Sequence, residues 1–424
     1  MSVIHISLAL LLLVFGELVG YYYVENYLNV TSASIEDAQF LLVFSLIGAA
    51  ASVVAVPSNG LLIAKENFLA ISLIEIAKIL FNLFIAIILL KYGGNRLRLY
   101  AALMAVCSFI LPIGYHVYCK RHFAGIIKFT FNRNQKDYKE IAGFAGWTLL
   151  GASAVIGKRQ GSAMIINLFF ANAFNAAYGV AGQVSHAALL FTSTVRQSAV
   201  PQIMKNQEGN EGRSLSLVYA ISRYTYLIMM LVSVPLILCI DLVLNLWLGD
   251  VIPPFTKEFV IFMLIAGMVS NLGSGFDASI QATGKICRYQ IGYSIINLSL
   301  LPIIYVLFML GVPVYTNVIV NVILTLFTLI FQVWTMMQLT KFSFVDFWKM
   351  TLLPSMITTI VAFVPLLAVQ HFISAGGLRW EIIFSGLSFC WVAFCIFLLG
   401  LSIRERTLLL NFLSSRIGWI EKKH

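Results

Sequence analysis

The segment GFAGWTLLGASAVIGKRQGSAMIINLFF, residues 143–170, decides the class of this protein. It is about 28 residues long, or about 42 Å of α-helix, which is enough to cross a bilayer. Lys158 and Arg159 lie in its middle, where each charge would cost about 2.5–3.5 kcal/mol if it faced lipid. We therefore expect both cations to face water or an anion inside a helical membrane protein, unless they snorkel to the surface or pair with acids.

The composition of the whole chain supports the same class. Of its 424 residues, 60% are hydrophobic and 11% are charged, and the mean hydropathy is +0.91. A soluble domain carries about 25% charged residues. Lipid must therefore solvate most of the apolar surface, and the net charge of +10 is better explained by membrane topology than by binding to nucleic acid.

Apolar runs of spanning length follow one another to the end of the chain. They are continuous rather than alternating, which predicts membrane helices and not strands. Twelve helices are expected at residues 3–24, 39–63, 68–90, 98–118, 141–170, 173–203, 216–246, 255–282, 288–310, 314–338, 350–371 and 381–402. The predicted fold class is an all-α polytopic membrane protein.

A basic polar segment, residues 119–140, divides these helices into two bundles. The N-terminal bundle, residues 1–118, has four helices, and the C-terminal bundle, residues 141–402, has eight. Because many transporters consist of two similar halves, we expect the first bundle to lack two helices. The tail, residues 403–424, mixes basic and large apolar side chains, which is typical of an amphipathic helix on the inner membrane surface.

Lysine and arginine predict the orientation. With the N-terminus inside, cytoplasmic loops and the tail hold 19 of the 28 Lys and Arg residues, outside loops hold five, and four lie within spans. This bias predicts that both termini are cytoplasmic. The six cysteines have no metal-binding spacing, so we expect free thiols.

The sequence contains no Walker A segment, no H-E-x-x-H and no G-x-S-x-G. We therefore expect neither enzymatic activity nor a metal or cofactor, and the polar residues within spans become the functional candidates. Glu75 and Lys78, spaced i, i+3, are expected to form an ion pair. Asp277, in a glycine-rich stretch, is a candidate for coupling transport to a proton or cation. Arg196 is expected to reach the surface or line the cavity.

Three segments carry a resemblance to a known family. The first comprises Val56-Pro57, Leu62-Ile63-Ala64-Lys65-Glu66, Ile74-Glu75 and Lys78. The second comprises Gln160-Gly161, Asn167-Leu168-Phe169-Phe170, Asn175-Ala176-Ala177, Gly182-Gln183-Val184, Pro201-Gln202-Ile203 and Lys205. The third comprises Gln281-Ala282-Thr283-Gly284-Lys285 and Tyr289-Gln290. In this order they resemble the oligosaccharide flippases of the polysaccharide-export family, in the MATE-like multidrug/oligosaccharidyl-lipid/polysaccharide superfamily.

The chain departs from that family at three points. Its members usually have fourteen helices, and this chain would begin at the third. Tyr178 stands where relatives often have a basic residue, and Ala171 stands where glycine is usual. The expected loss of two helices puts function of this chain on its own in question.

The resemblance implies two bundles that form a V around a central cavity. It also implies the cargo, an undecaprenyl-pyrophosphate-linked oligosaccharide that moves from the cytoplasmic to the periplasmic leaflet of a bacterial inner membrane. The pathway would be O-antigen (lipopolysaccharide), capsule or exopolysaccharide assembly, with polysaccharide polymerase or assembly proteins as candidate partners. The residues expected to line the cavity and bind this cargo are Lys158, Arg159, Gln160, Asn167, Asn175, Gln183 and Arg196.

Two other functions stay open. A multidrug or cation antiporter of the same fold predicts acids in the cavity, whereas Lys158 and Arg159 are cations. A membrane polysaccharide polymerase or ligase needs a sizeable periplasmic loop, and the longest outside loop expected here has about fourteen residues. A flippase that works by alternating access is the function that the sequence favours.

Overall fold

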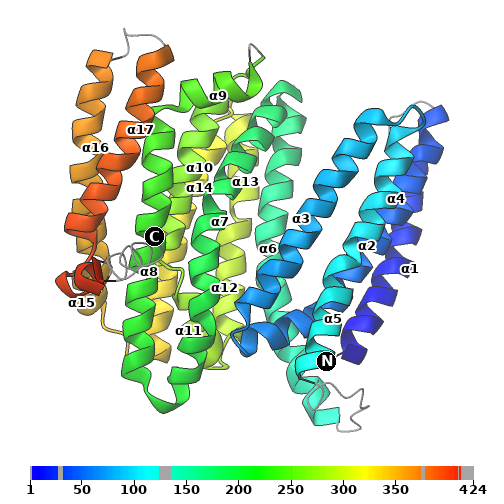
Figure 1. The fold of residues 1–424 in the computed structure, drawn as a ribbon, viewed down its shortest axis with the longest axis horizontal. Coiled ribbons are helices and arrows are strands. Elements are labelled where there is room, and N and C mark those ends of the chain that lie inside the picture. The colour runs from blue at the N-terminus through cyan, green and yellow to red at the C-terminus, as the bar shows by residue number, and fades with distance from the viewer. Residues whose placement is uncertain are drawn as a thin grey trace, which may run out of the picture. The chain divides into compact units, whose positions relative to one another are not determined.

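The structure is a computed structural model that describes residues 2–26, 32–123, 135–170, 172–249, 251–373, 378–408 and 410–411. Every secondary-structure element in these ranges is a helix, so the expected all-α membrane class is confirmed. The chain divides into two compact units, Met1–Asn134 and Gln135–His424, whose helices are labelled in Figure 1.

The first unit is built around its second helix. Its helices are α1 (Ser2–Asn26), α2 (Ser32–Ala64), α3 (Phe68–Lys91), α4 (Arg96–Ser108) and α5 (Ile110–His122). α1, α4 and α5 all pack against α2, and α3 packs on α4 and α5. A small core forms at one end, where Leu62, Tyr115 and Cys119 are fully or almost fully buried. Asn67 begins α3 and donates a hydrogen bond of 3.0 Å to Tyr118 on α5, which ties these ends together.

The second unit has the remaining helices. They are α6 (Gln135–Phe169), α7 (Asn172–Gly209), α8 (Glu211–Leu238), α9 (Ile240–Leu248), α10 (Thr256–Asn271), α11 (Phe276–Ala282), α12 (Cys287–Leu298), α13 (Leu300–Met309), α14 (Thr316–Leu339), α15 (Phe344–Phe347), α16 (Leu353–Ile373) and α17 (Leu378–Cys395), with two π-helical segments, η1 (Trp348–Leu352) and η2 (Ile396–Gly400).

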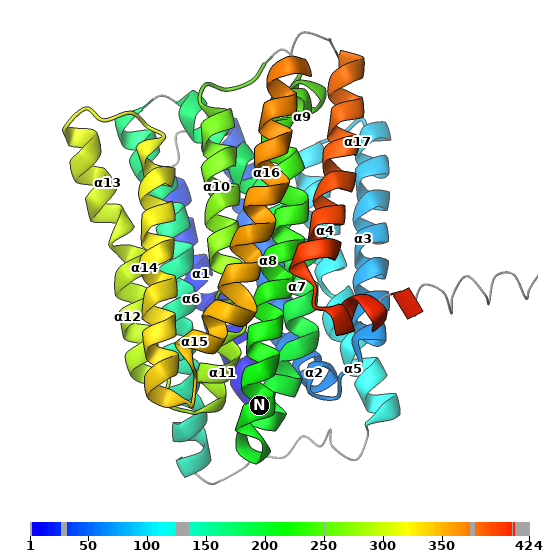
Figure 2. The same ribbon diagram turned by 90° about the vertical axis from the view of Figure 1, so that its left-hand side faces the viewer.

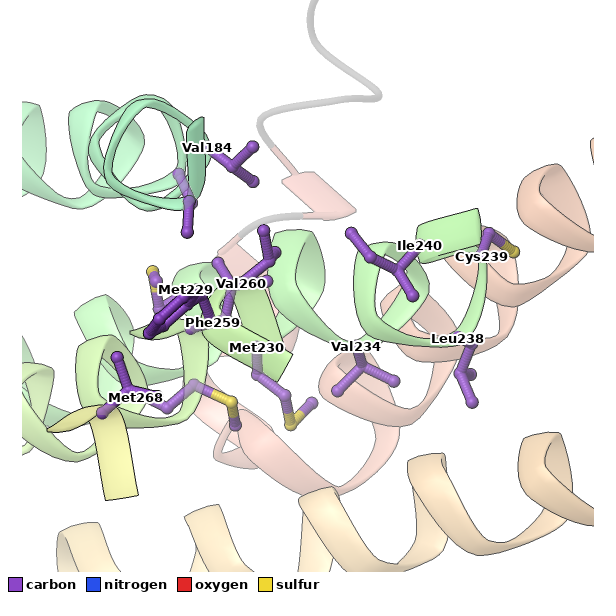
Figure 3. Packing of buried hydrophobic residues seen from close by; sticks show 14 of the residues in the cluster. Val184, Met229, Met230, Val234, Leu238, Cys239, Ile240, Phe259, Val260 and Met268 are labelled. Atoms are coloured by element: carbon purple, nitrogen blue, oxygen red, sulfur yellow. The ribbon is translucent and has the colours of Figure 1, made fainter. Parts of the chain in front are cut away.

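Helix α8 lies at the centre of this second unit, with α7, α10, α16 and α17 packed around it. Figure 3 shows Met229, Met230 and Val234 of α8 against Phe259 and Val260 of α10. Methionine side chains are flexible and fill irregular gaps between crossing helices. The result is a dense apolar core that fixes the positions of the surrounding helices.

Nine helical segments in the described ranges are long and apolar enough to cross a membrane. A tenth forms if α10 and α11, which are bent by 42° at a short break, make one broken span. Of the twelve expected spans, the two at 141–170 and 173–203 are long helices, α6 and α7, but they are too polar for this group. The polar residues that make α6 and α7 less hydropathic include those that the sequence predicts to bind the cargo.

Several expected spans contain breaks that hydropathy did not predict. The span at 216–246 divides into α8 and α9 at Cys239, four residues after Pro235. Proline lacks a backbone donor and weakens the helix around it. The span at 98–118 divides into α4 and α5 at Phe109, and the span at 288–310 divides into α12 and α13 at Ser299. The six cysteines are free, as expected.

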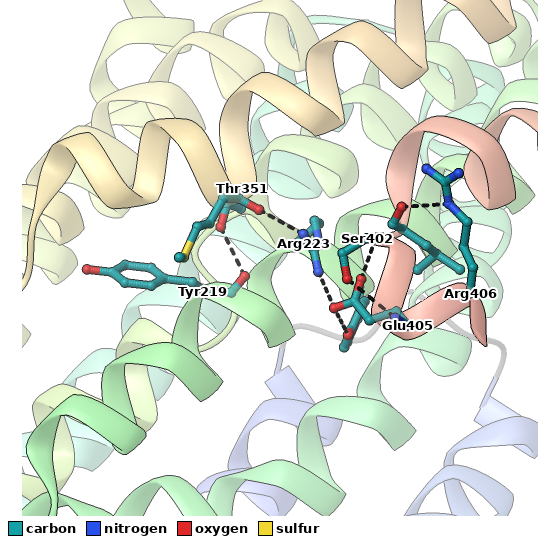
Figure 4. A network of polar contacts seen from close by, with 9 residues as sticks. Tyr219, Arg223, Thr351, Ser402, Glu405 and Arg406 are labelled. Carbon is teal, nitrogen blue, oxygen red and sulfur yellow. Dashed lines mark hydrogen bonds and ion pairs between the residues drawn. The ribbon is translucent and has the colours of Figure 1, made fainter. Parts of the chain in front are cut away.

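The beginning of the tail is fixed to the second unit by a polar network (Figure 4). Glu405 accepts hydrogen bonds from Arg223 and Tyr224 of α8 and from the backbone of Ser402 at 2.7 Å. Arg223 also donates to the carbonyl of Met350 in η1 at 3.3 Å. π-Helical turns displace backbone carbonyls from the α-helical pattern, and this arginine satisfies one of them.

After η2 the chain turns away from the axis of α17 and runs sideways as a short helix over residues 403–408 (Figure 2). Ile403 and Leu408 are exposed on this helix, and Leu410 is exposed after it. The amphipathic tail expected at residues 403–424 stays a prediction, because residues 412–424 lie outside the described residues.

Candidate functional site

A row of glycines sets the rotation of α6 about its own axis. A β-carbon added at Gly151 would lie 2.0 Å from Gln290 of α12, and one at Gly161 would lie 2.7 Å from Leu301 of α13. Gly157, between them, faces Leu298. Only glycine permits this close approach, so the glycine face of α6 must lie against α12 and α13.

This rotation sends the two cations of α6 in different directions. Lys158 is half-buried, and its Nζ donates a hydrogen bond of 3.1 Å to Oδ1 of Asn321 on α14. Arg159, about 100° further around the helix, is exposed, as is Gln160. The sequence suggested that both cations edge one broad cavity. In the structure Lys158 is held inside the second unit and Arg159 is open to the outside of it.

The exposed side of α6 and α7 combines polar residues with apolar ones such as Ile156, Met164 and Phe191. α6 exposes Arg159, Gln160 and Asn167, and α7 exposes Gln183, His186 and Arg196. Asn175, near the start of α7, is half-buried. An exposed polar surface of this kind is expensive against hydrocarbon, because side-chain amides and guanidinium groups there lose their hydrogen bonds to water. It is suited to water or to a polar ligand.

A second polar cluster lies where α11, α12 and α14 meet. Asp277 Oδ1 accepts a hydrogen bond from Tyr289 Oη and another, of 3.2 Å, from Gln332 Nε2. Gln332 also donates to Tyr289 Oη at 3.0 Å. Arg196 of α7 is close enough for a direct electrostatic interaction with Asp277 and with Tyr293. The structure therefore brings together Arg196 and Asp277, which lie about eighty residues apart in the sequence.

Helix α14 connects the two clusters. Its polar side chains recur every three or four residues and face into the unit, where each is buried or half-buried. They are Asn317, Asn321, Thr325, Thr328, Gln332 and Thr335. Asn321 holds Lys158 near one end of the row, and Gln332 holds Asp277 near the other. The Nδ2 of Asn317 is buried and has no hydrogen-bond partner among the described residues, so it is available as a donor close to Asn321.

The expected ion pair between Glu75 and Lys78 does not form among the described side chains of α3. Glu75 is exposed and accepts only a long hydrogen bond of 3.5 Å from Tyr115 Oη of α5. Lys78 is half-buried beside Cys107, whose sulfur lies 3.8 Å from the Lys78 carbonyl oxygen. Residues three apart share a helix face, but their side chains meet only where neighbouring helices do not draw them apart.

Sequence reasoning missed three residues of the site: Asn321, Tyr289 and Gln332. For Asn321 and Gln332 a signal was present, because the polar row of α14 follows the 3.6-residue period of a helix through an otherwise apolar run. Tyr289 was quoted only as part of the third resembling segment. No sequence signal pairs it with Asp277, since that contact depends on the break between α10 and α11.

Within the described ranges, no group of three or more His, Cys, Asp or Glu side chains could hold a metal ion. What the second unit offers is hydrogen-bond donors and positive charge on α6, α7 and α14, with one fixed carboxylate. Comparison of the chain with protein-family models, with curated proteins and with solved structures finds no match.

Proposed function

We propose that the protein is a flippase that moves an anionic, lipid-linked oligosaccharide across a bacterial inner membrane. The cargo class follows the resemblance of three sequence segments to polysaccharide-export flippases, and undecaprenyl pyrophosphate is the carrier that this resemblance implies. Within this proposal the protein acts by alternating access and serves O-antigen, capsule or exopolysaccharide assembly.

One observation carries the proposal: α6 and α7 expose more polar side chains than the nine apolar spans do. α6 and α7 are long enough to cross a bilayer, but their exposed side carries Arg159, Gln160, Asn167, Gln183 and Arg196. Sugars need such polar groups, and a pyrophosphate needs cations. Arginine suits a pyrophosphate because its planar guanidinium can engage two phosphate oxygens at once.

Lys158 and Arg159 have separate roles in this proposal. Arg159 is exposed and would contact the pyrophosphate directly. Lys158 is anchored on Asn321 and adds positive charge behind it, where the low dielectric of the interior strengthens its field. The hydroxyl and amide groups of the polar row on α14 would then solvate that charge in place of water.

One observation favours a second candidate, a cation antiporter. Asp277 is a single carboxylate held inside a helical unit, and only its Oδ1 takes the hydrogen bonds from Tyr289 and Gln332. An intramembrane acid of this kind is a functional hypothesis in its own right. The two candidates differ in the charge they require, since a flippase depends on Arg159 and an antiporter depends on Asp277.

Charge reversal separates these candidates. In a strain that lacks its own flippase, Arg159→Glu should abolish surface glycan while the protein remains in the membrane, because a desolvated charge contact is worth about 2–5 kcal/mol. Arg159→Lys should keep partial activity, since it preserves the charge and loses only the two-oxygen contact. Arg288→Glu, at an exposed cation of the same unit, is the matched control and should behave as wild type.

Lys158→Glu should also abolish transport, but it removes the donor to Asn321 and is expected to lower stability as well. Protein level and thermal unfolding must therefore be measured beside glycan. Normal surface glycan from the Lys158→Glu, Arg159→Glu double variant at normal protein level would rule out the proposed role of the cations. Loss of drug or cation efflux in Asp277→Asn, with glycan unchanged, would favour the antiporter.

A further inference from the structure

The first unit contains an apolar groove of about 530 Å³ between α1, α2 and α5. Its floor consists of small residues, Ala9 of α1 and Ala50 and Ala51 of α2, which are almost completely buried. Larger aliphatic side chains such as Leu10 and Ile113 stand at its walls and are more than half exposed. The groove is therefore a preformed channel along the helices, with its open side uncovered in this unit.

The polar groups of the groove are confined to one end. Ser58 and His116 line it there, and the far end is lined by Leu13, Ile47 and Phe109. The sulfur of Cys119 lies 3.6 Å from the carbonyl oxygen of Ser58, which places the last turns of α2 and α5 at the same level. The groove thus has a polar end and an apolar end, like an amphiphilic molecule.

Positive charge lies just beyond the polar end. Lys120 follows His116 by four residues, so both stand on one side of α5. Arg121 and His122 complete a basic last turn. The Lys and Arg bias of the loops predicts that this end is cytoplasmic. An anionic headgroup at the cytoplasmic surface, with its chain directed toward the membrane centre, would match both the charge and the polarity of the groove.

We propose that this groove binds the hydrocarbon chain of a polyprenyl phosphate, with the phosphate at the His116 and Lys120 end. The inference rests on the proposed function, because it takes the occupant to be the lipid carrier of the cargo.

The proposal predicts selective binding of a lipid probe by the purified full chain. The probe is undecaprenyl phosphate, and its binding is compared with that of phosphatidylglycerol, an anionic phospholipid, by native mass spectrometry. Ile113→Trp fills the groove from its exposed wall. It should weaken binding of undecaprenyl phosphate by about tenfold or more, which corresponds to about 1.4 kcal/mol.

The matched control is Val106→Trp. Val106 lies on α4, is as exposed as Ile113 at 58% against 59%, and does not line the groove. It should bind the probe as wild type does. Thermal unfolding shows whether Ile113→Trp is folded, and Val54→Trp, at a second exposed wall residue, replaces it if it is not.

The polar end has its own test. Replacing Lys120 and His116 together by Gln should reduce the preference for undecaprenyl phosphate over uncharged undecaprenol, while binding of undecaprenol stays unchanged. Equal binding of phosphatidylglycerol and undecaprenyl phosphate by the wild type would show that the groove takes any membrane lipid, and would overturn the inference. Probe binding by both Ile113→Trp and Val54→Trp at the wild-type level, with both variants folded, would also overturn it.

These outcomes are separate from those of the transport test. Arg159→Glu tests the transport proposal through surface glycan, and the groove variants test the lipid site through binding of undecaprenyl phosphate. If Arg159→Glu keeps surface glycan, the proposed role of the cations fails whatever the groove binds. If the groove variants keep probe binding, the lipid site fails whatever the transport assay gives.

Discussion

Helix α3 of the first unit and helix α8 of the second are both apolar enough to span a membrane, yet they are used differently. Only 6% of the apolar stretch of α3 is buried, against 61% for α8. The first unit therefore places most of its apolar surface toward surroundings that must be hydrocarbon. The second unit differs at α8, whose apolar surface is enclosed in a core, whereas 17% of the apolar stretch is buried both in α14 of this unit and in α2 of the first.

The charged residues of the two units differ in the same way. Glu75 of α3 is exposed and has one long hydrogen bond, whereas Asp277 of α11 is held by Tyr289 and Gln332. Lys78 lies beside an apolar helix, whereas Lys158 is anchored on Asn321. Asp277 and Lys158 of the second unit are held by hydrogen-bond partners, and this is the difference that the predictions examine.

The largest effect on stability is expected at Asp277. Asp277→Ala removes the acceptor of two hydrogen bonds and leaves the Tyr289 hydroxyl as a buried donor without an acceptor, at a cost of about 1–3 kcal/mol, whereas Gln332 keeps its hydrogen bond to Tyr289. Glu75→Ala, the matched acid of the first unit, should change stability little. The measurement is thermal unfolding of both variants in the same detergent. An equal fall in unfolding temperature for both variants would mean that the hydrogen bonds of Asp277 add no stability beyond that of an exposed acid.

A comparable effect is expected from overpacking the glycine face of α6. Gly151→Val places a branched side chain where a β-carbon would lie 2.0 Å from Oε1 of Gln290. This atom is the movable end of a side chain, so the cost is expected at the low end of the about 1–3 kcal/mol that overpacking brings. Gly60→Val is the control in α2, because nothing lies within 4 Å of an added β-carbon there. Both changes alter helix propensity in the same way. A fall in unfolding temperature for Gly60→Val as large as that for Gly151→Val would contradict the packing described for α6.

The smallest effect is expected at the tail, where pH acts on Glu405. Burial alone would raise the pKa of this carboxyl, but hydrogen bonds from Tyr224 and Ser402 and the charge of Arg223 outweigh it, and the pKa lies below its usual value. A lowered pKa in the folded state adds stability above the usual pKa of glutamate, and this stability is lost as the pH falls through the folded value.

Glu405→Gln should therefore lower stability at pH 7 by about 1 kcal/mol, since the network is partly exposed. The difference from wild type should stay nearly constant down to about pH 5 and shrink as the pH falls further, below the usual pKa of glutamate. Thermal unfolding of both proteins across this pH range measures it. A difference that grows toward pH 4 would show that the ionised carboxyl does not stabilise the tail.

The sequence was sufficient for the fold class and for the position of Lys158 and Arg159 along the chain. It was not sufficient for their directions, because adjacent residues of a helix differ by about 100° and the rotation of α6 is set by its contacts at Gly151 and Gly161. Mean hydropathy sets α6 and α7 apart from the apolar spans, but it does not show which of their side chains are exposed. Pairing of Asp277 with Tyr289 requires the tertiary fold.

The central claim is that α6 and α7 present a water-accessible polar surface, while α3 faces lipid. Single cysteines introduced at Gln183 of α7 and at Leu83 of α3, both exposed, test it in a background without the native cysteines. In permeabilised cells, where the reagent reaches both sides of the membrane, a charged maleimide should label Gln183→Cys rapidly and Leu83→Cys slowly. The reason is that the reaction needs a hydrated thiolate. Equal, slow labelling at both positions would contradict the claim and would make α7 another lipid-facing helix.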